Sequence, residues 1–351
     1  RDAAAWALAA IKPDPKVAIP ALVASGRAGR DSRCPAAIYA LGSFGEAAVP
    51  ALIDLLKTTG PDLRHSELCA LAQIGPAGKA AISPLVEALR DPDREIRQDA
   101  ASALARIGPA AVEPLIRALR DHDARVRGGA ARVLELLRKD AAVAVPHLIE
   151  ALGDPDRHVR PLAAQGLGPI GQKSQQAITA LIHTMKDPDH EVRFAASVAL
   201  QVIGMSSYAS LRPLLGDHDA RLRDDAASAL SGLATIKGFS RREGETDEQA
   251  RGRANSARAA LLADLKNGDE QIRQGAARAL GYVGEEVVPD LVKALEDSSP
   301  LVRLGAVRAL GIMGDQAAAA LEPVRQRLDD PAPEVRGAAD VTIKAITKPS
   351  R

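Results

Sequence analysis

Apolar side chains recur every three or four residues along most of the chain, the spacing that places them on one face of an α-helix. In the stretch 91–120, Ile96 and Leu104 share one such face, which predicts a first helix. Gly108 then ends that helix, because glycine readily adopts the left-handed backbone conformation that a helix C-terminus requires. A second apolar stripe that includes Leu115 predicts a second helix after the turn.

This two-helix pattern repeats along the sequence. Every copy but one carries an arginine at the position of Arg97, which we call the register arginine, and the exception has Cys34 there. Successive register arginines lie mostly 30 or 33 residues apart. Alanine follows three residues later and leucine seven residues later in nearly every copy. Because one pair of short helices cannot bury both apolar stripes, neighbouring copies are expected to stack into a solenoid. The register arginines are Arg1, Arg64, Arg97, Arg127, Arg160, Arg193, Arg223, Arg273, Arg303 and Arg336.

Aspartates fill the polar turns that precede the first helices. We expect Asp91 to cap the N-terminus of its helix and Pro92 to occupy the first helical position, where its missing N–H has no cost. The aspartate four residues before each register arginine, such as Asp93, is expected to pair with its own arginine, here Arg97. The same aspartate is also within reach of the arginine of the adjoining repeat, which predicts a ladder of ion pairs along the solenoid.

The pattern resembles the HEAT repeat family and, within it, the short HEAT-like repeats named for phycobilisome lyases. Its motif, D-P-D-x-x-[VI]-R-x-x-A-A-x-A-L-x-x-[IL]-G, occurs with small departures at 91–108 and 187–204. The resemblance covers nearly the whole chain and implies an all-α fold, a right-handed α-solenoid (superhelix) of about ten HEAT-like helix pairs. It specifies the fold far better than the function, because the repeat occurs in many unrelated proteins.

We expect one solenoid over residues 1–351, with both ends truncated or uncapped. The regular spacing fails between Gly204 and Lys266, where residues 237–256 are extra, polar and of mixed charge. These residues predict a mobile loop that leads into a helix near Asp247. A tolerated surface insertion and a functional protrusion both fit this composition.

The composition excludes several partners. The 46 Lys and Arg residues nearly balance the 45 Asp and Glu residues, and aromatic residues make up only 2% of the chain, so we expect no nucleic-acid partner. No uninterrupted apolar run approaches the roughly 20 residues that a membrane-spanning helix needs, so we expect no membrane partner. We expect a soluble, cytoplasmic protein.

The sequence shows no catalytic constellation. The two cysteines, Cys34 and Cys69, are interpreted as small packed residues, and the seven histidines as structural or solvated. Deoxyhypusine hydroxylase resembles this architecture, but it carries repeated His-Glu pairs, and here His190-Glu191 is the one such pair. We therefore predict no catalytic residue, no metal site and no cofactor.

Function must then be carried by the surface. The main hypothesis is a non-catalytic scaffold that binds a protein or peptide partner in a concave groove lined by the second helices. Alternatives are a bilin lyase-like enzyme or chromophore chaperone, and a regulatory or sensor domain of a larger protein; end-to-end self-association is also left open. The candidate partner-binding residues are outward second-helix positions and residues of the irregular region. They are Asp54, Glu87, Arg117, Glu150, His183 and Lys293 on second helices, and Tyr208, Arg241 and Arg242 in the irregular region.

Overall fold

A computed structural model describes residues 2–28, 36–58, 60–236 and 245–348. All regular structure in these ranges is helical, either α-helix or short 3-10 helix, and none of it is a strand. The helices follow one another in the predicted order of ten first–second pairs and one last helix. The prediction of an all-α solenoid is therefore confirmed.

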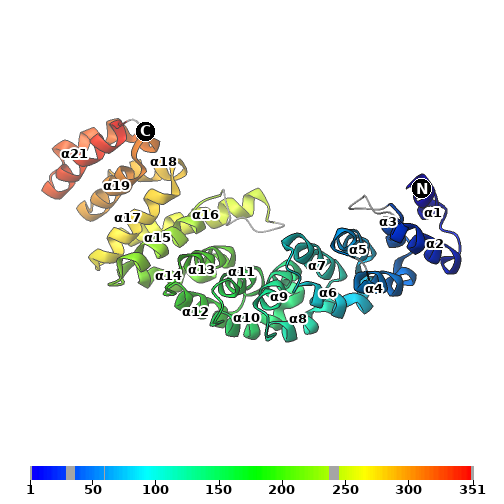
Figure 1. Cartoon of the computed structure of the whole chain (residues 1–351). Helices are drawn as coiled ribbons and strands as arrows, with labels where there is room; N and C mark the ends of the chain where they lie inside the picture. The colour runs from blue at the N-terminus through cyan, green and yellow to red at the C-terminus, as the bar shows by residue number, and fades with distance from the viewer. Residues whose placement is uncertain (1, 29–35, 59, 237–244, 349–351) are drawn as a thin grey trace. The chain divides into compact units, whose positions relative to one another are not determined.

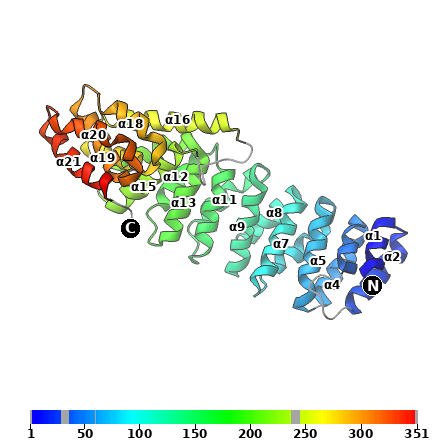
Figure 2. The same ribbon diagram turned by 90° about the horizontal axis from the view of Figure 1, so that it is seen from above.

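The chain divides into two compact units, Arg1–Ile170 and Gly171–Arg351. In the first unit, the first helices pack side by side in one layer and the second helices form another (Figures 1 and 2). The first helices are α1 (Asp2–Ile11), α3 (Ala36–Gly42), α5 (Pro61–Ile74), α7 (Arg94–Ile107), α9 (Ala124–Leu137) and α11 (Val159–Ile170). The second helices are α2 (Pro15–Ala28), α4 (Val49–Thr58), α6 (Ile82–Ala88), α8 (Val112–Ala118) and α10 (Val145–Ala151).

The second unit has the same kind of two-layer arrangement. Its first helices are α13 (His190–Ile203), α15 (Ala220–Ala234), α17 (Glu270–Val283), α19 (Pro300–Met313) and α21 (Pro333–Thr347). Its second helices are α12 (Gln175–Thr184), α14 (Tyr208–Leu211), α16 (Asp247–Asp264), α18 (Val288–Ala294) and α20 (Leu321–Arg325). Short 3-10 helices, such as Pro109–Ala111, join most first helices to the second helices that follow them.

The repeated alanine and leucine form the core between stacked first helices. Ala100 and Leu104 on α7, and Ala130 and Leu134 on α9, are all fully buried. Burying one leucine side chain contributes about 1.5–3 kcal/mol. Alanine recurs because a larger side chain would overpack the contact between adjacent first helices.

In the turns, the aspartate that caps the first helix is not the one predicted. Asp93, not Asp91, is the N-cap of α7, and its Oδ1 accepts a hydrogen bond from the backbone N–H of Glu95 at 2.8 Å. Asp91 lies in the turn, where its Oδ1 accepts from the backbone N–H of Asp93 at 2.9 Å. Pro92 therefore lies in the turn rather than in the helix. Either aspartate satisfies the capping pattern in sequence, and only the geometry of the turn separates them.

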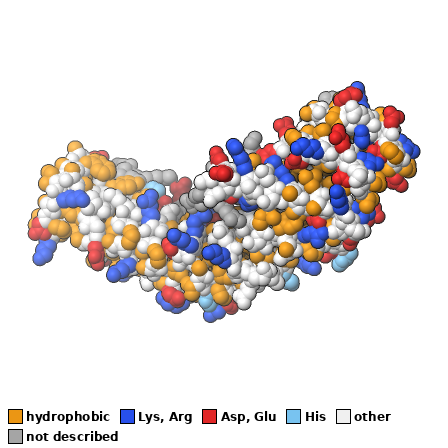
Figure 3. All heavy atoms as spheres, turned by 180° about the vertical axis from the view of Figure 1, so that it is seen from behind, with side chains coloured by type: hydrophobic (Ala, Val, Ile, Leu, Met, Phe, Trp, Pro, Cys, Tyr) orange, Lys and Arg blue, Asp and Glu red, His pale blue; other side chains and the backbone are white. Residues whose placement is uncertain are grey.

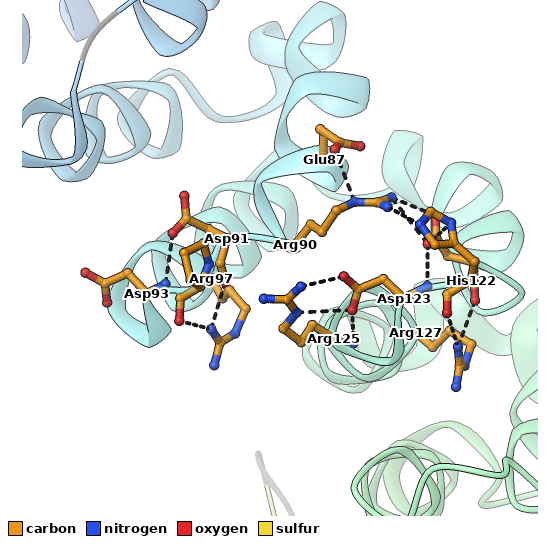
Figure 4. A network of polar contacts seen from close by, with 11 residues as sticks. Glu87, Arg90, Asp91, Asp93, Arg97, His122, Asp123, Arg125 and Arg127 are labelled. Atoms are coloured by element: carbon orange, nitrogen blue, oxygen red, sulfur yellow. Dashed lines mark hydrogen bonds and ion pairs between the residues drawn. The ribbon is translucent and has the colours of Figure 1, made fainter.

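Ion pairs do connect neighbouring repeats, but the aspartate in each pair is not the one expected. Arg97 does not pair with Asp93; its Nη1 donates to the backbone carbonyls of Asp91 and Pro92, both at 2.8 Å (Figure 4). Arg127 makes the equivalent carbonyl contact and also reaches forward to the carboxylate of Asp154 in the next turn, at 2.7 Å and 2.8 Å. In each of these ion pairs, the partner of the register arginine is the aspartate six residues before the next register arginine. Equivalent pairs are Arg64–Asp91 and Arg303–Asp330.

The insertion is helical over much of its described part. The predicted helix near Asp247 is confirmed, since α16 begins there behind a capping box formed by Thr246 and Gln249. Ala250 and Arg253 of this helix are buried, so this half of the expected loop packs into the unit instead of projecting from it. The other half falls on residues 237–244, outside the described residues.

Candidate protein-binding surface

The sequence-predicted residues of the first unit all lie exposed on second helices: Asp54 on α4, Glu87 on α6, Arg117 on α8 and Glu150 on α10. The three acidic residues form surface ion pairs within the chain. These pairs are Arg27–Asp54 at 3.1 Å, Arg90–Glu87 at 3.1 Å and Arg120–Glu150 at 2.7 Å. The hydrogen bond from Arg120 lowers the pKa of the Glu150 carboxyl. These acidic charges therefore have partners of their own, while Arg117 extends into solvent.

The predicted residues of the second unit have different environments. His183 on α12 and Lys293 on α18 are exposed, as expected for a contact surface. Tyr208 is only 8% exposed, and its hydroxyl donates to the carboxylate of Asp264 at 3.0 Å. Burial, followed by the charge of Asp264, raises the pKa of the Tyr208 hydroxyl. Arg241 and Arg242 lie outside the described residues.

The environment of Tyr208 corrects its prediction as a surface residue. Arg212 also donates to Asp264, at 2.6 Å, so the two donors neutralise and satisfy a carboxylate that is almost fully buried at the end of α16. A buried carboxylate requires such partners. Tyr208 thus holds the short α14 against α16. It is not part of the candidate surface.

The second unit carries a groove that was not predicted from the sequence. It runs across α17, α19 and α21 and has a volume of about 720 Å³. Its apolar lining includes Ile312, whose residue surface is 45% exposed, and Val341, which is 66% exposed. Exposed apolar side chains next to one another are a common mark of an interaction site.

Small residues account for the hollow. Gly311, Gly337 and Ala338 line the groove, so little side-chain volume fills the space between α19 and α21. Gly311 also allows these helices to approach closely, because a Cβ there would lie 2.7 Å from the hydroxyl of Thr342. That hydroxyl donates to the backbone carbonyl of Val307 at 3.0 Å and fixes α21 against α19.

Two arginines flank the apolar lining. Arg278 on α17 is held by Asp224 at 3.1 Å, whereas Arg308 on α19 is exposed. Glu334 provides the acidic member of the lining. Arg278, Arg308 and Val341 each stand five residues after a register arginine, so reading the first-helix positions in register would have found them. Apolar contacts beside guanidinium groups suit a segment with an apolar anchor and a carboxylate.

The comparison with family models decides the classification. The model for HEAT repeats matches residues 35–105, 82–145, 145–231 and 258–344, which together exceed half of the chain. The chain belongs to the HEAT repeat family. No curated protein matches it.

Solved structures match this HEAT protein at low identity. An engineered protein is 24% identical, covering 96% of this chain and 95% of that one, with a TM-score of 0.38. The CpcE–CpcF complex of phycocyanin lyase from Nostoc sp. PCC7120 is 24% identical, covering 43% of this chain and 98% of that one, with a TM-score of 0.38. Kap95p, in a complex with RanGDP, is 15% identical, covering 98% of this chain and 54% of that one, with a TM-score of 0.47.

The charge of this HEAT surface is mixed. Figure 3 shows acidic and basic side chains interspersed with apolar ones over the face in view. By length and composition alone, His190–Gly216 is the one described stretch able to cross a membrane, but 56% of its apolar window is buried within the fold. Such burial is typical of a core helix.

Proposed function

We propose that this HEAT protein is a non-catalytic scaffold that binds a segment of a partner protein, and that the groove across α17, α19 and α21 is its main contact surface. The groove carries the proposal because it places exposed Ile312 and Val341 beside the exposed guanidinium of Arg308. A HEAT solenoid is a fold in keeping with such a role, since stacked repeats present continuous surfaces for binding.

The lining defines the chemistry of the partner segment. An apolar side chain of the partner would cover Ile312 and Val341, which removes apolar surface from water at about 25 cal/mol per Å². A carboxylate one or two residues away would meet Arg308, and a charge-assisted hydrogen bond contributes about 1.5–3 kcal/mol. The groove volume of about 720 Å³ lies in the range of ligand pockets in proteins.

The second-helix surface remains a prediction for further contacts. Arg117, His183 and Lys293 are exposed there and are free of the acidic pairs that occupy Asp54 and Glu150. Reversing these charges tests that surface independently of the groove.

A peptide-display experiment tests the proposal. A random peptide library is selected on the intact chain, and the enriched peptides are measured by fluorescence polarisation. We expect peptides that combine apolar and acidic residues, with binding lost in Ile312→Glu and weakened about tenfold in Arg308→Glu. Arg106→Glu, at an exposed arginine of α7 outside both surfaces, is the matched control and should bind normally. Peptides that lose binding only in Arg117→Glu would overturn the groove and favour the second helices.

The non-catalytic part of the proposal has a separate test. A bilin added to the purified chain should keep its absorbance spectrum, because the groove provides no residue arranged to attach it. A shifted absorbance band would favour the alternative of a lyase-like enzyme or chromophore chaperone.

A further inference from the structure

Three reactive side chains meet in the first unit, away from the groove. His65 and Cys69 lie one helical turn apart on α5, and Asp99 lies on the neighbouring α7. The Sγ of Cys69 lies 3.7 Å from Nε2 of His65, and Nδ1 of the same imidazole lies 2.6 Å from Oδ2 of Asp99. Thiol, imidazole and carboxylate therefore form a continuous chain.

We propose that Cys69 is a reactive thiol that exchanges with disulfides and so becomes linked to small thiols, with His65 as its base. Asp99 is a hydrogen-bond acceptor, so it places the imidazole proton on Nδ1 and leaves the lone pair of Nε2 facing Cys69. This is the arrangement in which an imidazole accepts a proton from a nucleophile. Asp99 acts through His65 and is a positioning residue.

The site is accessible to a small molecule. Cys69 is partly exposed, and the side chains of His65 and Asp99 are 39% and 22% exposed. A structural metal ion fits the same atoms poorly, because Asp99 already occupies Nδ1. The three side chains lie close enough together to hold an ion, but Asp99 would then have to exchange its hydrogen bond to the imidazole for a metal bond.

Repeat stacking does not require these residues. The position of His65 is taken by Gln98 in the next repeat, and the position of Cys69 is taken there by Ser102. Both helices nonetheless bury the alanine and leucine six and seven residues after the register arginine, although in α5 a buried glutamate, Glu67, replaces the alanine three residues after it. The thiol and imidazole are therefore additions to the repeat and not part of its packing rule.

The reaction balances without a further oxidant. His65 Nε2 takes the proton of the Cys69 thiol, and the thiolate attacks one sulfur of a disulfide R–S–S–R. An S–S bond forms between Cys69 and one R–S group, and the original S–S bond breaks. The second R–S group leaves as a thiolate and takes up the proton. The disulfide is the oxidant, and a second thiol reverses the reaction by the same route.

An aromatic disulfide, Ellman's reagent, tests the proposal on the full chain. Cys34→Ser leaves Cys69 as the single thiol. At pH 7 a free cysteine is only a few per cent thiolate, so a base in place should speed the reaction about tenfold over the same chain in urea. His65→Gln should remove this acceleration and Asp99→Asn should reduce it. His158→Gln, which removes an exposed histidine elsewhere, should leave the rate unchanged.

A second measurement keeps the result independent of folding. Circular dichroism establishes that each variant is folded, and mass spectrometry after incubation with glutathione disulfide should find one glutathione on Cys69 of the Cys34→Ser chain. The proposal is overturned if folded Cys69 reacts no faster than the unfolded chain, or if folded His65→Gln reacts as fast as its parent.

Discussion

At the residue scale, one position in most repeats takes the backbone into the positive-φ region. It lies eleven residues after the register arginine and ends the first helix, with φ of 84° at Gly108 and 83° at both Gly204 and Gly284. Arg138 holds the same position after α9 and has φ of 53°. The periodicity of the sequence predicted the glycines and shows Arg138 as an exception. For a residue with a Cβ, this conformation costs about 1–2 kcal/mol.

Replacing Arg138 by glycine should therefore stabilise the protein. We expect the free energy of unfolding to rise by about 1 kcal/mol, because glycine adopts positive φ without a steric penalty. Arg132→Gly is the matched control, since Arg132 lies inside α9, where glycine costs about 1 kcal/mol. Urea unfolding followed by circular dichroism measures both. A loss of stability in Arg138→Gly would show that its side chain matters more than its backbone.

The ladder predicts a contrast between two arginines on α9. Arg127→Ala should cost roughly 1–3 kcal/mol, because it leaves the carboxylate of Asp154, whose side chain is 6% exposed, without its main partner. Arg125→Ala should cost much less, because Arg125 is 48% exposed and pairs at the surface with Asp123. Thermal unfolding compares them, and equal losses would argue against the ladder as a source of stability.

Acid should weaken the same ladder. Burial by itself raises the pKa of Asp154, but the hydrogen bond from Arg127 and the backbone N–H of Asp156 lower it below its usual value. A carboxyl with a lowered folded-state pKa stabilises the fold above its unfolded pKa of about 3.9, and this stability is lost as the pH falls through the folded-state pKa. Unfolding free energies should drop below about pH 4, and less steeply in Arg127→Ala. Parallel pH profiles would contradict this.

At the element scale, the irregular region shows where sequence reasoning succeeds and where it stops. The glycine-containing polar stretch and Asp247 predicted the start of α16. No sequence pattern indicates that Asp264, at the other end of that helix, is buried against Tyr208 and Arg212. Such contacts join residues more than 50 positions apart, and no local pattern encodes them. The groove was missed for a different reason, since its lining comes from three first helices, whereas the prediction placed the contact surface on second helices.

Removing the Tyr208 hydroxyl tests the link between α14 and α16. Tyr208→Phe should destabilise the protein by about 1–3 kcal/mol, because Asp264 keeps its charge but loses a donor in a buried site. Hydrogen exchange should rise in α14 and α16. Phe194→Leu, which changes an exposed aromatic side chain on α13, is the control and should alter neither stability nor exchange by much. Unchanged exchange in Tyr208→Phe would mean that Arg212 alone suffices.

At the scale of the whole molecule, stability is built from neighbouring repeats, so damage should stay local. Leu134→Ala removes a fully buried side chain of α9 and should cost about 2–5 kcal/mol. Because each repeat contacts mainly its neighbours, we expect faster hydrogen exchange in α7, α9 and α11 and little change in α19. Equal acceleration in α19 would show that the two compact units unfold as one.

The ion pairs between neighbouring repeats also make the two edges of a repeat chemically different. Arg64, Arg127 and Arg303 each donate from one repeat to the turn of the following repeat, so every such repeat offers a cationic side at one edge and an anionic side at the other. A duplicated segment one period long would carry one of each and would join its neighbours correctly without further change. Growth by tandem duplication is thus chemically simple for this chain. Arg193 departs from the rule, since it pairs with Asp225 inside α15 rather than with an aspartate of a turn. A repeat duplicated at this point would therefore make a different ion pair with its neighbour.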